Sequence, residues 1–153
     1  MDFLLFLDSK SEEILALVEK AGYRVSEDIR ICRDMPRFFG ALRKPQKNLV
    51  ICTENIKRVT GYYMPRSNND DHFKTRLHIN QTLRHEAVHV AQQCNKGGLV
   101  YIDSKKDMSL YKYKNEQIDA STLISGEKEK EQEAYALETR PKKVIEVLKT
   151  YCL

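Results

Sequence analysis

The sequence lacks any long hydrophobic run. No stretch approaches the roughly 20 apolar residues that a membrane-spanning helix needs, so we expect no transmembrane segment and no membrane partner. The short apolar run 3–7 is flanked by Asp2 and Asp8, whereas a secretory signal has a positively charged start and a longer apolar core. We therefore expect no signal peptide and a cytoplasmic protein.

Closely spaced cysteines are also missing. The four cysteines, Cys32, Cys52, Cys94 and Cys152, form no CxxC pair, and zinc sites built from cysteine usually contain such pairs. For a cytoplasmic chain the pattern predicts that all four are reduced and serve as small, partly buried apolar side chains.

The sequence also lacks a strong excess of one charge. The chain carries 26 basic and 22 acidic residues, a net charge of +4, and this balance disfavours a nucleic-acid partner. The loop 36–47 mixes basic and aromatic residues, as nucleic-acid surfaces do, but it contains no nucleic-acid motif. With 41% hydrophobic and 31% charged residues over 153 positions, the composition excludes a disordered chain. It predicts a single domain over residues 1–153.

Hydrophobic periodicity predicts helices and a few short strands. Ser9 followed by Glu12 resembles a capping box and opens a helix that we expect to extend to Ala21. Further helices are predicted over 80–93, around 118–124, from about 127 to near Pro141, and at the C-terminus. Strand-like runs are 29–33, 49–53, 60–64, 76–79 and 99–102. This order predicts an α+β fold.

The residues that carry chemistry are His85, Glu86 and His89, an HExxH pattern inside a predicted helix. Histidines four residues apart point to the same side of a helix and can ligate one zinc ion. The neighbouring Glu86 can take a proton from a zinc-activated water and pass it to a leaving amine. The inner positions, Ala87 and Val88, are apolar, whereas a surface helix with incidental histidines would have polar residues there. The pattern predicts a zinc site with Glu86 as catalytic base.

Residues 82–91 resemble the consensus of the zincin metallopeptidases. The resemblance implies a zinc-dependent hydrolase that uses Zn²⁺ to cleave peptide bonds in a peptide or protein substrate. It also implies that the HExxH helix packs on a small antiparallel sheet, with N-terminal and C-terminal helices around it. In that clan the edge strand of the sheet binds substrate in extended form. Residues 76–79 are the strand placed for this role.

A third ligand must come from elsewhere, because catalytic zinc usually has three protein ligands. The metzincin pattern HExxHxxGxxH does not continue, since Gln92 and Asn95 stand at its glycine and last histidine positions. The gluzincin branch takes a glutamate from a later helix, and residues 131–137 resemble that helix. Glu133 is the predicted ligand because residues three and four positions on are apolar. Glu131 is the main alternative ligand. A second alternative is that these glutamates form a solvated acidic face of the helix and bind no metal.

Several alternatives stay open at this point. A donor for the developing oxyanion could be Tyr63, His78, Tyr111, Tyr113 or Tyr135, and each could equally be a packing residue. A zincin-like fold could also act as a non-catalytic binding or sensor module, but a site kept for structure needs no base, so Glu86 favours an enzyme. A basic nucleic-acid-binding protein with an incidental HExxH is the remaining alternative.

Overall fold

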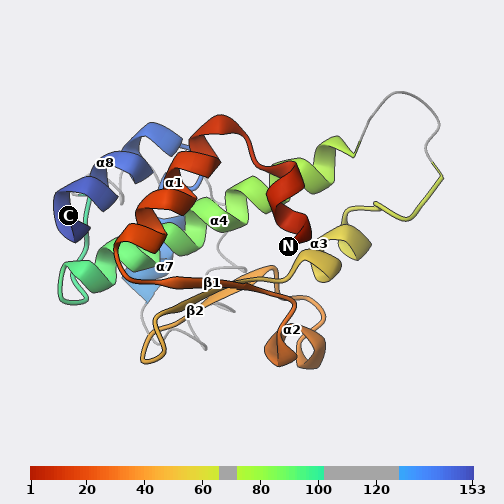
Figure 1. The fold of residues 1–153 in the computed structure, drawn as a ribbon, viewed down its shortest axis with the longest axis horizontal. Coiled ribbons are helices and arrows are strands. Elements are labelled where there is room, and N and C mark those ends of the chain that lie inside the picture. The colour runs from red at the N-terminus through yellow and green to blue at the C-terminus, as the bar shows by residue number, and fades with distance from the viewer. Residues whose placement is uncertain (66–71, 102–127) are drawn as a thin grey trace.

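The computed structural model describes residues 1–65, 72–101 and 128–153 (Figure 1). Their helices and strands form an α+β arrangement, as the sequence predicted at the level of the fold class. In chain order the elements are η1 (Asp2–Phe6), α1 (Ser9–Lys20), β1 (Arg24–Glu27), α2 (Arg30–Asp34), β2 (Gly40–Arg43), β3 (Asn48–Ile51), α3 (Thr53–Val59), α4 (Phe73–Cys94), α7 (Lys128–Leu137) and α8 (Pro141–Cys152).

The sheet has three strands in the order β1-β3-β2. Strand β2 pairs with β3 in antiparallel fashion through a short hairpin, but β1 pairs with β3 in parallel. The sheet is therefore mixed, and the antiparallel sheet predicted above is wrong in this respect. Successive side chains of a strand point to opposite faces. Accordingly Leu49 and Ile51 enter the main core, while Val50 packs with Cys32 and Cys52 on the other face.

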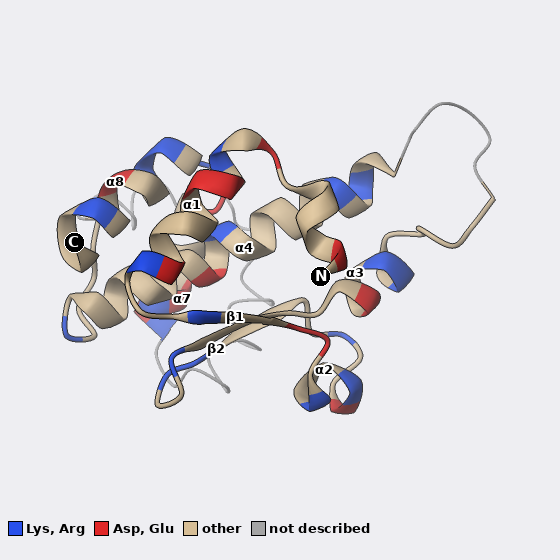
Figure 2. Cartoon of the chain, viewed as in Figure 1, with Lys and Arg blue, Asp and Glu red and all other residues tan. Residues whose placement is uncertain are grey.

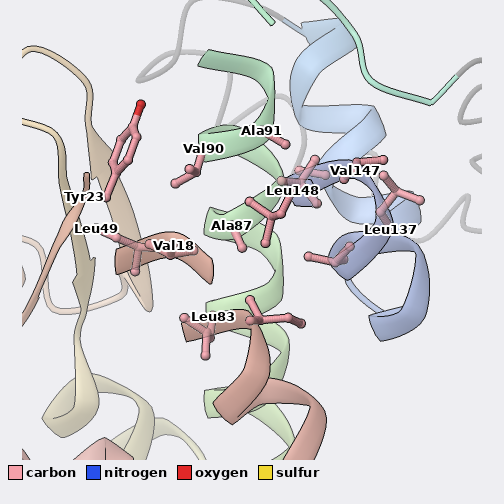
Figure 3. Packing of buried hydrophobic residues seen from close by; sticks show 14 of the residues in the cluster. Val18, Tyr23, Leu49, Leu83, Ala87, Val90, Ala91, Leu137, Val147 and Leu148 are labelled. Carbon is pink, nitrogen blue, oxygen red and sulfur yellow. The ribbon is translucent and has the colours of Figure 1, made fainter. Parts of the chain in front are cut away.

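Helix α4 is the central element of the fold. It contacts α1 and α8 on one side, α7 on another, and strands β2 and β3 (Figure 1). In Figure 3 it runs between Leu49 of the sheet and Leu148 of α8, and Ala87 lies on the part of the helix between these two residues. Burial of apolar side chains is the main favourable term in folding. Since α4 has apolar neighbours on several sides, nearly all residues of its second half are buried.

Two segments predicted as strands are helical. Residues 76–79 belong to α4, which begins at Phe73, because Thr75, Ile79 and Leu83 are buried at four-residue intervals and extend the helical period backwards. Residues 29–33 lie largely in α2, a short helix with the buried side chain Cys32. The edge strand expected at 76–79 therefore does not exist.

The four cysteines form two disulfides, Cys32–Cys52 and Cys94–Cys152, and none of the four is free. The prediction that they are reduced is therefore wrong. The partners lie 20 and 58 residues apart in the sequence, so only the folded chain brings them together. Disulfides persist mainly in oxidising compartments, so these two bridges count against the cytoplasmic location from which the reduced state was predicted.

Other predictions are met in part. The helix expected from Ser9 is α1, capped by Asp8, whose side chain accepts a hydrogen bond from the Ser11 amide. Residues 60–64 form a turn after α3, and no strand lies over 99–101. The helix expected around 118–124 lies outside the described residues. Within the described parts, no helix is long and apolar enough to cross a membrane. Basic and acidic residues are mixed on α1, α2 and α8 (Figure 2).

Candidate metal centre

Helix α4 carries both histidines on its buried side. His85 and His89 are one turn apart, and their ring centroids are separated by 5.0 Å in an edge-on arrangement. Both side chains are buried. The helical spacing thus does what the sequence predicted, since it turns both imidazoles toward one point.

Helix α7 meets these histidines with one polar face. Glu131, Tyr135 and Glu138 follow each other at steps of four and three residues, which places them on the same side of a helix. One Glu131 oxygen lies 3.1 Å from Nε2 of His85, and the other lies 2.8 Å from Nε2 of His89. The Tyr135 ring packs on His85 with centroids 4.5 Å apart. A carboxylate therefore bridges the two imidazoles at their Nε2 atoms.

The other ring nitrogen of each histidine is held by an acceptor. His85 Nδ1 lies 3.1 Å from an oxygen of Glu138, and His89 Nδ1 lies 2.8 Å from Oε1 of Gln92. The Gln92 amide cannot turn round, because its Nε2 donates to the Lys130 carbonyl at 3.1 Å and to a second buried carboxylate. A nitrogen that faces an acceptor must carry the proton. Gln92 thus favours the Nδ1-protonated form of His89. Glu138 favours the same form of His85, although Glu131 offers the second His85 nitrogen an acceptor as well. In the neutral Nδ1-protonated form, Nε2 is left as a lone pair.

In that neutral form two Nε2 lone pairs and a carboxylate face one another, an arrangement that a metal cation or a proton on the imidazoles stabilises. Nε2 of His89 is a buried atom without a hydrogen-bond partner in the described structure, since Glu131 is near it but not aligned for a hydrogen bond. Ligand atoms from His85, His89 and Glu131 all lie within 4.8 Å of one another. Tetrahedral zinc with bonds of about 2.0–2.1 Å separates its ligand atoms by about 3.3–3.4 Å. The Glu131 oxygens, at 3.1 and 2.8 Å from the two Nε2 atoms, are a few tenths of an ångström closer than this separation.

The pKa values of His85 and Glu131 also show that the site favours positive charge. Burial lowers the pKa of His85, but hydrogen bonds with Glu131 and Glu138 outweigh burial and hold that pKa well above its usual value. Burial raises the pKa of Glu131, but the two imidazoles more than offset it and bring that pKa far below its usual range. Charged forms are therefore favoured on both sides of the contact, as in a site prepared for positive charge.

Glu86 lies beside these residues on α4 and faces strand β2. It is buried, and burial raises the pKa of its carboxyl group, although both neighbouring histidines act in the opposite direction. Gly40 of β2 comes so close that a Cβ there would lie 3.4 Å from Cγ of Glu86 and 2.6 Å from Cγ2 of Thr82. The backbone of β2 thus passes directly over the part of α4 that carries Glu86.

The structure differs from the prediction at the third carboxylate. Glu131, not Glu133, lies with the two histidines, so the predicted position of the Glu133 side chain is wrong. The Glu133 carboxylate is fully buried and accepts hydrogen bonds from Gln92 Nε2 and from the backbone amides of Val100 and Tyr101. Two residues along a helix turn a side chain by about 200°, so the two glutamates point to different partners.

The candidate oxyanion donors are scattered. Tyr135 is beside His85, whereas the Tyr63 hydroxyl donates to Glu54 on α3. His78 packs edge-on against Phe39 at 5.6 Å between ring centroids. Two further candidates, Tyr111 and Tyr113, lie outside the described residues. Tyr135 therefore packs on a histidine of the site.

Sequence reasoning missed the residues that orient the histidines. Glu138 had a recognisable signal, because Glu131, Tyr135 and Glu138 repeat at helical spacing and so mark one polar face that α7 continues into the turn after it. Gln92 had a weaker one, since it follows His89 by three residues and can reach back along the helix. Gly40 had none, because only the folded structure shows that Thr82 and Glu86 of α4 lie against it.

The chain belongs to a family described as a domain of unknown function, DUF8637, whose model matches residues 3–153. No curated protein and no solved structure matches the chain.

Proposed function

We propose that this member of the DUF8637 family is a zinc-dependent hydrolase of the zincin type that cleaves peptide bonds. The observation that carries the proposal is the convergence of His85, His89 and Glu131 at one buried point, with each histidine held at Nδ1 by an acceptor. Zinc favours two imidazoles and a carboxylate in catalytic sites, and histidines that ligate it usually donate Nδ1–H to a carboxylate or carbonyl.

The zinc would be held by His85, His89 and Glu131, whose ligand atoms converge at one buried point. When bound there, zinc supplies a Lewis acid that polarises a carbonyl group and makes a water molecule more acidic. Glu138 and Gln92 keep the two imidazoles in the ligating tautomer. Tyr135 packs on the His85 ring and limits its rotation.

Glu86 is the proposed general base. Its carboxylate takes a proton from the water whose oxygen forms a bond to the carbonyl carbon. The same proton then goes to the amine nitrogen as the carbon–nitrogen bond breaks, so Glu86 ends in its initial state. Burial raises its pKa, which makes the carboxylate a better proton acceptor than one in water.

Strand β2 supports a peptide as the substrate class. It is paired with β3 along one side, and along its other side it has no strand partner among the described residues. An extended peptide can add to such an edge through main-chain hydrogen bonds. Since Gly40 of β2 lies against Glu86 and Thr82, a peptide on this edge would pass close to the base.

The test is metal content and affinity. Protein reconstituted with zinc and freed of excess metal should hold about one zinc per chain by atomic spectroscopy, and replacement of both His85 and His89 by alanine should remove it. Glu131→Gln removes a charged ligand. Loss of a residue that only orients a ligand weakens zinc binding by about 10–100-fold, and loss of this ligand should weaken it more.

The matched control is Glu129→Gln, which makes the same change at an exposed position of α7 and should leave zinc affinity unchanged. Wild-type protein that holds no zinc after reconstitution would refute the proposal. Full zinc affinity in Glu131→Gln would refute the ligand set.

A further inference from the structure

A chain of buried hydrogen bonds leads away from the candidate metal centre. It starts at His89 Nδ1, which lies 2.8 Å from Oε1 of Gln92, and continues from Gln92 Nε2 to Glu133 Oε1 at 3.0 Å. The Glu133 carboxylate also accepts from the backbone amides of Val100 and Tyr101, each at 2.9 Å. Gln92 and Glu133 are almost completely buried. The chain thus joins a histidine of the site to the backbone segment that follows α4.

We propose that Gln92 and Glu133 form a positioning relay that keeps His89 in its metal-binding tautomer and couples zinc binding to the docking of residues 100–101. The inference rests on the proposed zinc function. It gives Glu133 a role that differs from metal ligation.

Gln92 needs a fixed orientation to do this. A side-chain amide has an oxygen that accepts and a nitrogen that donates, and rotation by 180° exchanges them. The Lys130 carbonyl and the Glu133 carboxylate both demand the donor, so they direct Nε2 toward themselves and Oε1 toward His89. If the amide turned, its NH₂ group would face Nδ1. His89 would then be protonated on Nε2, the atom that has to bind the metal.

Glu133 must be a carboxylate and not an amide. Its Oε1 accepts from Gln92 and Val100, and its Oε2 accepts from Tyr101, so both oxygens face N–H donors. Glutamine at this position has one oxygen and would turn its NH₂ group toward a backbone N–H or toward Gln92. In a fully buried site an unsatisfied donor is destabilising, because it loses its hydrogen bond to water and gains no other partner. Glu133→Gln therefore loosens either the Gln92 end or the backbone end of the relay.

The backbone end is held firmly by a second element. The Tyr101 hydroxyl accepts a hydrogen bond from Arg140 at the start of α8, and the Tyr101 ring lies 5.3 Å from the Arg140 guanidinium carbon and 5.4 Å from Lys143 Nζ. Residues 100–101 are therefore docked between α7 and α8. Buried hydrogen bonds in a chain strengthen one another, and coupling between two sites is reciprocal. Zinc at His89 should thus tighten the docking of residues 100–101, and their docking should raise zinc affinity.

The first test is Gln92→Met, which keeps the length of the side chain and removes its acceptor. Zinc affinity, measured by competition with a chromophoric chelator, should fall by about 10–100-fold, the usual effect of losing the partner of a ligating histidine. Gln93→Met makes the same change at the next position of α4 and should leave affinity unchanged. Long-range ¹H–¹⁵N NMR should show His89 protonated on Nδ1 in wild type and in a mixture of tautomers in Gln92→Met, a change that simple destabilisation does not produce.

The second test needs no variant for its main readout. Amide hydrogen exchange at Val100 and Tyr101 should slow when zinc is added to wild type, and this effect should be lost or reduced in Glu133→Gln. Wild type that binds zinc with unchanged exchange at these amides would overturn the coupling. Wild-type affinity and tautomer in Gln92→Met would overturn the relay while leaving the zinc site intact. Failure of wild type to bind zinc would instead overturn the proposed function.

Discussion

The His85 imidazole illustrates how single side chains define the candidate site. Both of its ring nitrogens face carboxylates, Glu131 of α7 at Nε2 and Glu138, the residue after α7, at Nδ1. A carboxylate at each nitrogen favours positive charge on or beside the ring. Because Glu138 fixes Nδ1, a metal has to compete only for the Nε2 side. The two carboxylates thus have different tasks, which depend on the nitrogen that each one reaches.

At the same scale, Glu86 is the residue whose task can be separated from metal binding. Glu86→Gln keeps the size of the side chain and removes the base, so turnover of a fluorogenic peptide library should fall by at least ~100-fold. Zinc content should stay near one per chain, as measured by atomic spectroscopy on the same samples. Loss of zinc in this variant would make Glu86 a ligand, and unchanged peptide cleavage would contradict its assignment as the base.

At the scale of elements, the contact between β2 and α4 depends on a residue without a side chain. A Cβ at position 40 would lie 2.6 Å from Cγ2 of Thr82 and 2.9 Å from the Val50 carbonyl oxygen. Both distances are shorter than any normal contact of a carbon atom, so the strand can approach the helix this closely only with glycine there. The position of the sheet over Glu86 follows from that approach.

Gly40→Ala should therefore lower the free energy of unfolding by about 1–3 kcal/mol, the usual effect of overpacking. The measurement is urea denaturation of the apoprotein. Thr82→Ser removes the nearer methyl group and keeps a hydroxyl for the hydrogen bond that Thr82 makes to the His78 carbonyl. In a Thr82→Ser background Gly40→Ala should cost less, which a double-mutant cycle detects. Equal costs in both backgrounds would show that the strand does not approach the helix as described.

For the whole molecule, the two disulfides fasten different parts of the fold. Cys32–Cys52 joins α2 to the residue after β3, on the face of the sheet away from α4. Cys94–Cys152 joins the last residue of the HExxH helix to the last residue of α8, two residues that are 58 positions apart in the sequence. Helix α4 is thus tied to the C-terminus covalently and to the sheet by packing.

Loop size predicts how much each bridge contributes. In the chain-entropy treatment, loops of 58 and 20 residues correspond to about 4 and about 3 kcal/mol of stabilisation. Replacing Cys94 and Cys152 together by serine should therefore lower the free energy of unfolding more than replacing Cys32 and Cys52 together. Both differences should disappear when wild type and variants are compared under strong reductant. Four reactive thiols in native wild-type protein would contradict the disulfides.

The sequence by itself determined the elements that rest on local periodicity. Helix α1, the second half of α4 and helix α8 follow from apolar residues at helical spacing, and the pairing of His85 with His89 follows from the same spacing. Glu86 as candidate base also needs nothing beyond its place in the pattern. These inferences hold because a helix fixes the relative directions of residues three and four apart, whatever lies around it.

Only the tertiary structure decided which side of each helix meets which neighbour. From the sequence, Glu131 and Glu133 are equivalent carboxylates on opposite sides of α7, and the packing of α7 on α4 selects the first for the histidines and the second for Gln92 and a backbone turn. The parallel pairing of β1 with β3 and the joining of distant cysteines are decisions of the same kind. Contacts between residues far apart in the chain depend on how whole elements pack, and local periodicity carries no information about that.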